Sequence, residues 1–193
     1  ESELRNLAAV PFQIISPAGN HPIVGIFQDS LLGAHRFTRE NIIFSKREAM
    51  NLLMNYNNID IENLLKQDTV SSYNILSQII PSLSLKYTNK LWKDNEDFNT
   101  SKNVLEIENG NYVRGHMDKG ILGSSSKGLL HRICNDYGNM RCSNFIDDFQ
   151  NIITEYMKTS SFSVGISDLL SNDTTKKSIE SVINEKKSDV KHL

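Results

Sequence analysis

The sequence has few cysteines and no excess of basic residues, so it does not have the composition of a disulfide-rich, zinc-binding or strongly basic protein. The 193 residues include two cysteines and four prolines, and the formal net charge is −2. Cys134 and Cys142 are separated by seven residues, which is too many for a CxxC zinc knuckle, and no second pair of cysteines completes a zinc site. We therefore expect two buried free thiols in a protein of a reducing compartment.

Charge and hydropathy exclude further classes of protein. With 21 basic and 23 acidic residues, the chain lacks the basic surplus of a free-standing DNA-binding domain. Its apolar runs are shorter than the roughly 20 residues that span a bilayer, and residues 1–5 do not resemble a signal peptide. The missing initiator Met is what we expect of a fragment. A content of 38% hydrophobic residues suits a globular chain with one sizeable core or two small ones.

The most informative stretch is residues 11–39, which holds three of the four prolines. Proline and glycine punctuate two short apolar runs, so the pattern predicts buried strands at residues 12–15 and 23–27, a turn at 16–20 and a helix that opens near Gln28. We expect Ile23 and Ile26 to lie in the core. Leu4 and Leu7, at helical spacing behind a possible cap at Ser2, are predicted to join them.

The order of residues in this stretch carries more information than its periodicity. It runs Ile15-Ser-Pro17, Gly19, Pro22, Gly25, Gln28-Asp29, Leu31-Leu-Gly33 and Thr38-Arg39. This long spaced pattern resembles the pore region of the largest subunit of multisubunit RNA polymerases. In that family the stretch follows a loop whose three aspartates hold the Mg²⁺ of nucleotidyl transfer. No such loop occurs in this sequence, so the resemblance implies a non-catalytic part of the enzyme with Mg²⁺ bound outside it. The alternative is a proline- and glycine-punctuated hairpin in some other mixed fold.

Local signals predict several further elements. Ser45 and Glu48 form a capping box before a helix to Met54. The pattern of residues 71–81 predicts a helix with one apolar stripe. Residues 93–102 are predicted to form an exposed acidic loop. Asn109-Gly110 lies between alternating apolar residues and predicts a hairpin over residues 104–115. A long amphipathic helix is predicted over residues 143–158, capped by Ser143.

Residues 118–131 form a basic, glycine- and serine-rich passage. They resemble the same family at Lys119, Gly123, Ser124, Ser125, Gly128, Leu129 and His131, whereas Gly120 stands where many relatives have a second lysine. Without the family, residues 123–128 resemble a degenerate phosphate-binding loop ahead of a helix, although they fail the GxxxxGK[ST] template.

Two other classes of function therefore stay open. One is a stand-alone, non-catalytic module that binds an anion or a nucleotide at residues 123–128. The other is a hydrolase, which would combine a histidine with an acid or a serine. The candidates for it are His116, His131, Asp118, Asp136 and Ser124.

The C-terminal part carries the last matching phrase. Residues 162–168 resemble the phrase that opens the funnel of the family, with matches at Phe162, Ser163, Gly165, Ile166 and Asp168. A mostly polar helix is predicted from about Asp173. Its thin apolar stripe is Ile179, Val182, Ile183, Val190 and Leu193. Phrases at residues 51–54 and 131–139 are most similar to polymerase subunits of large nucleocytoplasmic DNA viruses.

Together the patterns and the resemblance predict an α+β fold, with a pore region at residues 1–158 and the start of an all-helical funnel at 159–193. The resemblance implies a wall of the channel through which nucleoside triphosphates enter and backtracked RNA leaves. Gln28, Asp29 and Lys119 are the residues expected to contact nucleotide or RNA. The alternatives are that Gln28 and Asp29 cap a helix and that Lys119 is an ordinary surface lysine beside Asp118.

The resemblance also implies partners and a location. The partners are other polymerase subunits, including the second-largest, together with template DNA, RNA, nucleoside triphosphates and a transcript-cleavage factor. No membrane is implied. The location would be intracellular: the nucleus for a cellular protein, or a cytoplasmic viral factory or the virion for a viral one.

Overall fold

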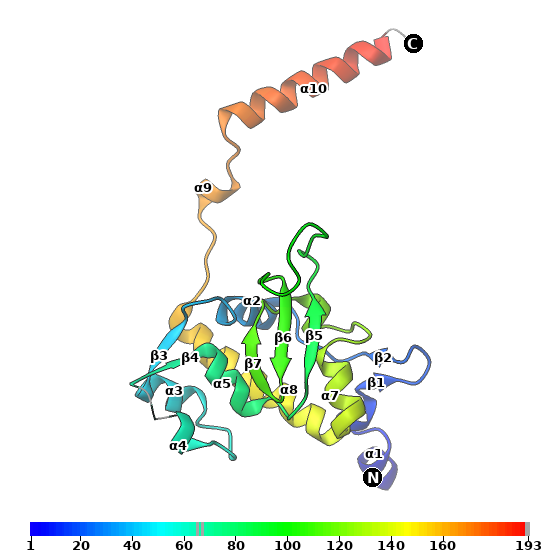
Figure 1. The fold of residues 1–193 in the computed structure, drawn as a ribbon. Helices are drawn as coiled ribbons and strands as arrows, with labels where there is room; N and C mark the ends of the chain where they lie inside the picture. The colour runs from blue at the N-terminus through cyan, green and yellow to red at the C-terminus, as the bar shows by residue number, and fades with distance from the viewer. Residues whose placement is uncertain (65, 67, 192–193) are drawn as a thin grey trace. The chain divides into compact units, whose positions relative to one another are not determined.

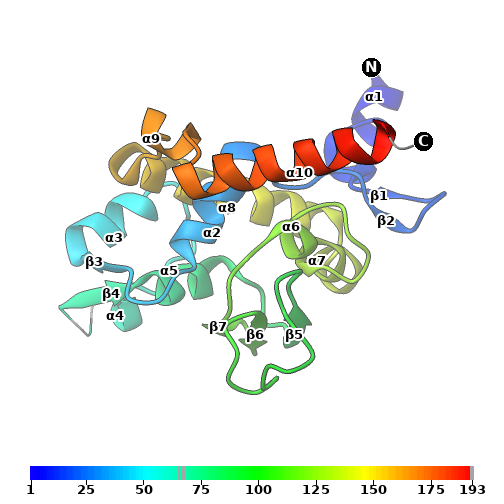
Figure 2. The same ribbon diagram turned by 90° about the horizontal axis from the view of Figure 1, so that it is seen from above.

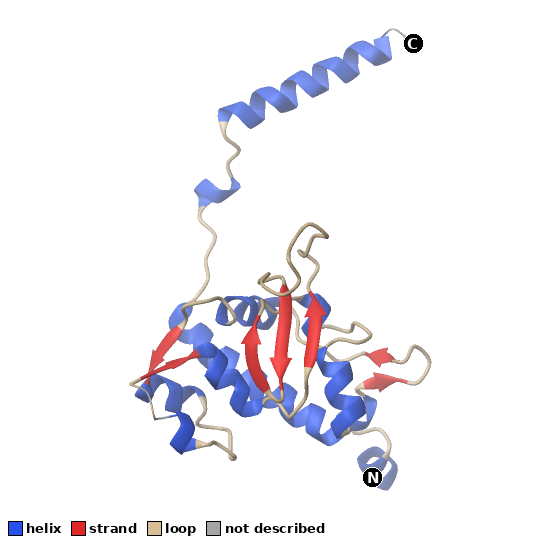
Figure 3. Cartoon of the chain, in the orientation of Figure 1, coloured by secondary structure: helices blue, strands red, loops and turns tan. Residues whose placement is uncertain are grey.

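The computed structural model describes residues 1–64, 66 and 68–191. By its contacts the chain separates into two units, Glu1–Ser160 and Ser161–Leu193. The first mixes helices with small antiparallel sheets (Figures 1 and 3), so the expected α+β fold is confirmed. In the second, the described residues form a short helix α9 (Ile166–Leu169) and a long helix α10 (Asp173–Lys191).

Helix α8 (Asn139–Ser160) is the centre of the first unit. It buries Cys142, Phe145, Phe149, Ile152, Ile153 and Tyr156 along one face. The elements that pack on it are η1 (Val10–Gln13), α2 (Gln28–Phe37), α3 (Lys46–Leu52), α5 (Ser72–Ile79) and α7 (Leu129–Tyr137). Apolar residues at helical spacing on α8 thus gather helices from both halves of the unit around one core.

Three antiparallel strands form the largest sheet, in the order β5 (Leu85–Thr88), β6 (Val104–Glu108) and β7 (Asn111–Arg114). Asn109 and Gly110, both at positive φ, make the turn between β6 and β7, so the predicted hairpin is confirmed. Helix α5 packs on β7. Figure 1 shows β5 as the outer strand on the side of α7.

Two further pairs of strands are short. The strands β1 (Ile15–Ser16) and β2 (His21–Pro22) form one pair, and β3 (Ile43–Ser45) and β4 (Thr69–Ser71) form the other. The remaining helices are α1 (Ser2–Asn6), α4 (Ile61–Leu64) and α6 (Lys119–Leu122). Helix α6 contacts α7, and Figure 2 shows the two close together.

The predicted helices are largely confirmed. Ser45 and Glu48 form the capping box of α3, and Ile75, Leu76 and Ile79 of α5 are fully buried. Two predicted caps are wrong, because Ser2 and Ser143 lie inside α1 and α8. Helix α8 begins four residues earlier than predicted, since Gly138 at a φ of 85° ends α7 and the chain enters α8 directly after it.

The N-terminal region departs most from the prediction. The 3₁₀ helix η1, which begins at Val10, replaces most of the strand predicted at 12–15, although Ile15 lies in β1, and residues 23–27 run without a strand partner. Leu4, Leu7 and Ile23 are 69%, 67% and 54% exposed, so the prediction that they are core was wrong, whereas Ile26 is buried as expected. Helix α1 buries none of its residues. Its apolar positions therefore face solvent in the described part of the chain.

The second unit has no buried residue of its own among those described. On α10 the stripe of Ile179, Val182, Ile183 and Val190 is confirmed as one exposed apolar row, and each of these side chains is 46% exposed or more. Leu193, expected on the same stripe, lies outside the described residues.

Candidate functional site

Gln28 and Asp29 are the first two residues of α2, and both are exposed. The N-cap position is Phe27, and no side chain caps the helix. Gln28 has a φ of 52°, a left-handed conformation that few residues other than glycine adopt. Because neither side chain caps the helix, the capping alternative is wrong, and both polar groups are presented to solvent at the positive end of a ten-residue helix.

Lys119 is the first residue of α6 and is exposed. Its neighbour Asp118 is the N-cap, and Oδ1 of Asp118 accepts the N–H groups of Gly120 and Ile121 at 2.8 and 3.1 Å. The second oxygen, Oδ2, accepts the N–H of Lys90 at 2.9 Å. Asp118 therefore fixes the start of α6, and the ammonium of Lys119 has no ion pair within the described ranges.

The segment before Gln28 lies against the end of α6. The N–H of Ile26 donates to the carbonyl of Leu122 at 2.9 Å. A Cβ on Gly25 would lie 3.1 Å from the backbone carbons of Gly123, so a larger residue there would push the two segments apart. The structure therefore brings the elements that carry Gln28, Asp29 and Lys119 next to each other, although nearly one hundred residues separate them in the chain.

The far end of α2 holds the same region in place. The N–H of Met117 donates to the hydroxyl of Thr38 at 3.1 Å, and Nδ1 of His116 donates to the carbonyl of Thr38 at 3.0 Å. Nδ1 of His35 likewise donates to the carbonyl of Met117 at 3.2 Å. Burial lowers the pKa of His116, which keeps the imidazole neutral near pH 7. These bonds fix the chain two residues ahead of Lys119.

Sequence reasoning missed this group of residues. Thr38 was part of the spaced pattern, but nothing local indicates that its hydroxyl accepts a hydrogen bond from a residue 79 positions later. His35 and His116, whose ring centroids lie 5.3 Å apart, carry no motif of their own. The available signal was the family pattern, which included Thr38 without showing its role.

The loop at residues 123–128 uses part of its backbone internally. The N–H of Lys127 donates to Nδ1 of His131 at 2.9 Å, and the N–H of Gly128 donates to the carbonyl of Ser125 at 3.4 Å. Gly128 is the N-cap of α7 without a side-chain cap. Because three of its N–H groups, those of Gly123, Lys127 and Gly128, already have acceptors, the loop is a weaker anion site than its composition suggests.

The hydrolase alternative has no supporting pair among the described residues. Asp118 caps α6, and Asp136 forms an ion pair with Arg132 at 2.8 Å. His116 bonds to a backbone carbonyl, and His131 bonds to a backbone N–H. Neither histidine is oriented by an acid, which a nucleophile–base pair requires.

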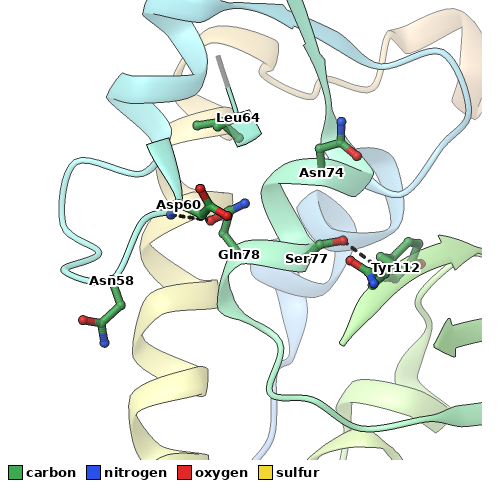
Figure 4. Close-up of a pocket in the computed structure, with 8 residues that line it drawn as sticks. Asn58, Asp60, Leu64, Asn74, Ser77, Gln78 and Tyr112 are labelled. Atoms are coloured by element: carbon green, nitrogen blue, oxygen red, sulfur yellow. Dashed lines mark hydrogen bonds between the residues drawn. The ribbon is translucent and has the colours of Figure 1, made fainter. Parts of the chain in front are cut away.

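A polar pocket lies elsewhere, between the loop before α4, helix α5 and the start of β7 (Figure 4). It has a volume of about 520 Å³. Its lining residues are Asn58, Asp60, Leu64, Asn74, Ser77, Gln78, Asn111 and Tyr112. Within it, Oε1 of Gln78 accepts the N–H of Asp60 at 2.9 Å. Amides and one carboxylate line this pocket without any cation, so it is poorly suited to phosphate.

No group of three or more His, Cys, Asp or Glu side chains is placed to hold a metal ion within residues 1–64, 66 and 68–191. Over the same residues, no helix has the length and apolar character needed to cross a membrane. The acidic residues of the loop at 93–102 instead order the loop itself, since Glu96 accepts from Ser101 and Asn103, and Asp97 accepts from Asn99 and Thr100.

Comparison with known proteins identifies the family of the chain. Residues 13–169 match the family described as RNA polymerase Rpb1, domain 3. The chain therefore belongs to the family of Rpb1 domain 3, a part of the largest subunit of RNA polymerase.

Two curated relatives share the match along the whole chain. They are the DNA-directed RNA polymerase II subunits RPB1-A and RPB1-B of Trypanosoma brucei brucei, each 26% identical over 196 aligned residues. The alignments cover the whole of this chain and only 11% of the length of each relative. The chain thus spans about a tenth of the length of these relatives.

Proposed function

We propose that the chain is a segment of the largest subunit of a DNA-directed RNA polymerase and that it walls the channel for entering nucleotides and backtracked RNA. The observation that carries the proposal is the family match over residues 13–169, together with a site whose three candidate residues lie on adjoining elements. The activity of the whole enzyme is nucleotidyl transfer, and this segment is a wall and support for it.

In this proposal the two parts of the chain have different roles. Residues 1–158 act as the pore region, and residues 159–193 begin the helical funnel. The Mg²⁺ of the reaction is bound by aspartates outside this chain. The partners are the second-largest and other subunits, template DNA, RNA, nucleoside triphosphates and a transcript-cleavage factor. The protein acts in the nucleus if it is cellular, and in a viral factory or the virion if it is viral.

In this proposal Lys119 contacts the phosphate groups of a nucleoside triphosphate or of RNA. Its ammonium lies at the start of a helix held by Asp118, and it is exposed without an ion pair in the described chain. A flexible point charge suits a triphosphate or an RNA end that must move on after contact. Gln28 and Asp29, on the adjoining segment, contribute polar groups and a carboxylate that limits how tightly an anion is held.

The reading frame of the complete protein gives the first test. A loop with three aspartates shortly before Glu1 is expected, and a complete protein that has none refutes the assignment to the polymerase subunit.

The second test uses an assembled polymerase whose complete largest subunit carries Lys119→Ala. We expect slower nucleotide addition and altered factor-stimulated cleavage of backtracked RNA, each by about tenfold, as the loss of one charge-assisted hydrogen bond of roughly 1.5 kcal/mol implies. Gln28→Ala should slow addition without reducing stability. The control is Lys93→Ala, an exposed lysine of the loop before β6. Wild-type elongation and cleavage by the Lys119→Ala enzyme at every salt concentration would show that Lys119 is an ordinary surface residue.

A further inference from the structure

The three-stranded sheet has one covered edge and one open edge. On the β7 side, α5 packs along the strand and the hydroxyl of Ser77 accepts the N–H of Tyr112 at 2.9 Å. On the other side, β5 pairs with β6 alone. The N–H of Asn89 donates to the carbonyl of Asn103 at 2.9 Å. Residues 89 and 103 are therefore a hydrogen-bonded pair of the antiparallel ladder. Because hydrogen-bonded pairs alternate in antiparallel sheets, Lys86 turns its N–H and C=O away from β6.

Thr88 lies two residues further and shares this orientation. In the described part of the chain, no hydrogen bond reaches the outward backbone groups of Lys86 and Thr88. An exposed row of unpaired N–H and C=O groups is a template for another strand. The edge of β5 is therefore competent to pair with a further extended segment.

A groove of about 390 Å³ runs along this edge. Residues 85–87 of β5 form one wall, and Lys127, His131, Arg132 and Asn135 form the other. At the end of the groove near residue 82, α7 is tied to the chain before β5, because the hydroxyl of Tyr137 donates to the carbonyl of Ser82 at 2.6 Å. An edge strand facing a helix across a groove is the geometry in which domains bind extended peptides by strand addition.

The charge of the groove is of one sign. Lys86, Lys127 and Arg132 line it, and no carboxylate does. Lys86 is paired with Glu106, which is 10% exposed, so this pair stays in place. Arg132 and its partner Asp136 are 54% and 41% exposed, and an exposed pair of this kind is held weakly and can exchange partners. Lys127 has no ion pair in the described chain. The groove thus favours an acidic occupant.

One buried donor in the wall of the groove also lacks an acceptor. Nδ1 of His131 accepts the N–H of Lys127, so the proton of the neutral ring is on Nε2. Nε2 is buried without a hydrogen-bond partner, and His131 is 8% exposed. A buried donor left unpaired is unfavourable, and the missing partner is an acceptor.

We propose that the β5 edge is a docking site for an extended, acidic segment of a partner protein, which adds a fourth strand beside β5. The segment pairs with the backbone of Lys86 and Thr88, and its acidic side chains meet Lys127 and Arg132. Its side chains or carbonyl groups also supply an oxygen to His131. This role is separate from the proposed channel contacts of Gln28, Asp29 and Lys119, and it can fail without affecting them.

The first experiment changes the peptide and leaves the 193-residue chain as it is. A fluorescent ten-residue peptide that alternates Glu with Val is titrated with the chain, and binding is read by anisotropy. N-methylation of alternate backbone nitrogens should weaken binding at least tenfold, since it removes strand pairing but keeps the charges. Replacement of Glu by Lys should abolish binding. On binding, the amide of Lys86 should gain protection from hydrogen exchange.

The second experiment changes the groove. Lys127→Glu and Arg132→Glu should each weaken binding about five- to tenfold. Thr88→Pro removes one outward N–H while leaving the pairing with β6, and should weaken binding similarly, whereas Thr88→Ser should not. Arg47→Glu, an exposed arginine of α3 with the same change of charge, is the matched control and should bind as wild type.

Several results would overturn the proposal. The acidic peptide does not bind, or its N-methylated form binds equally well, so that backbone pairing plays no part. Inorganic phosphate at millimolar concentration displaces the peptide completely, so that the groove is an anion site. The chain self-associates, and Thr88→Pro abolishes the association, so that a second copy is the occupant.

Discussion

The hydroxyl of Thr38 accepts the backbone N–H of Met117 at 3.1 Å, and this bond joins the end of α2 to the segment that leads into α6. Both residues are fully buried. Thr38→Val keeps the shape of the side chain but leaves the N–H of Met117 without an acceptor, so we expect a loss of about 1–3 kcal/mol in the free energy of unfolding. Thr38→Ser keeps the hydroxyl and should lose less. Urea unfolding of the three proteins measures the difference, and equal stability of Thr38→Val and wild type would contradict it.

At Gly33, α2 lies close against α8. A Cβ at this position would lie 2.5 Å from Cγ2 of Ile153 and 2.8 Å from Cγ of Met157. Alanine favours a helix over glycine by about 1 kcal/mol, so overpacking must exceed this gain. We expect Gly33→Ala to lower the free energy of unfolding by about 1–2 kcal/mol. The double variant with Ile153→Ala should be less destabilised than the sum of its parts. Additive effects would show that the two helices do not meet there.

Signals carried by neighbouring residues were predictable from the sequence. The capping box of Ser45 and Glu48, the Asn109-Gly110 turn and the apolar stripe of α5 are each set within a few residues, and the structure has all three. Capping bonds, positive φ angles and helical periodicity depend on local chemistry. Elements of this kind are therefore recoverable without knowledge of the fold.

Features that depend on distant partners were not predictable. Leu4, Leu7 and Ile23 have the pattern of buried residues, yet nothing in the described chain covers them, so hydrophobicity alone placed them wrongly. Asp118 looked like a companion charge for Lys119, whereas its oxygens accept three backbone N–H groups, one of them from Lys90. The adjacency of α2 and α6 likewise depends on long-range bonds, such as those of Ile26 to Leu122 and of Met117 to Thr38.

The two cysteines should be inert in the folded protein. Both are buried free thiols, as expected from the sequence. Burial raises the pKa of Cys142 to about 12, and it raises the pKa of Cys134 as well. Because the thiolate is the reacting form, labelling by a disulfide reagent at pH 8 should be at least about 100-fold slower for the native chain than for the chain in urea. Rapid labelling of one thiol in the native chain would show that its region opens readily.

Glu106 gives the structure a measurable response to acid. Its side chain is 10% exposed and accepts from Nζ of Lys86 at 2.5 Å and from Nε of Arg114 at 2.6 Å. These bonds, with that from Lys86 the largest cause, lower the pKa of Glu106 below its ordinary value of 4.5. The folded state therefore binds this proton less readily than the unfolded chain. The stability that comes from the bonds of Glu106 to Lys86 and Arg114 is fully present above about pH 4.5. It is lost as the pH falls through the lowered pKa of Glu106.

Glu106→Gln keeps the size of the side chain and removes its charge. At pH 6 we expect the variant to lose about 1–3 kcal/mol in the free energy of unfolding, because Arg114 is 17% exposed and loses a charged acceptor. As the pH falls from 5 to 3, the difference from wild type should shrink, since protonation of Glu106 removes the same charge. Urea midpoints at pH 6, 5, 4 and 3 measure this, with Glu108→Gln at the exposed end of β6 as control. A difference that stays constant over this range would mean that the charge of Glu106 does not stabilise the sheet.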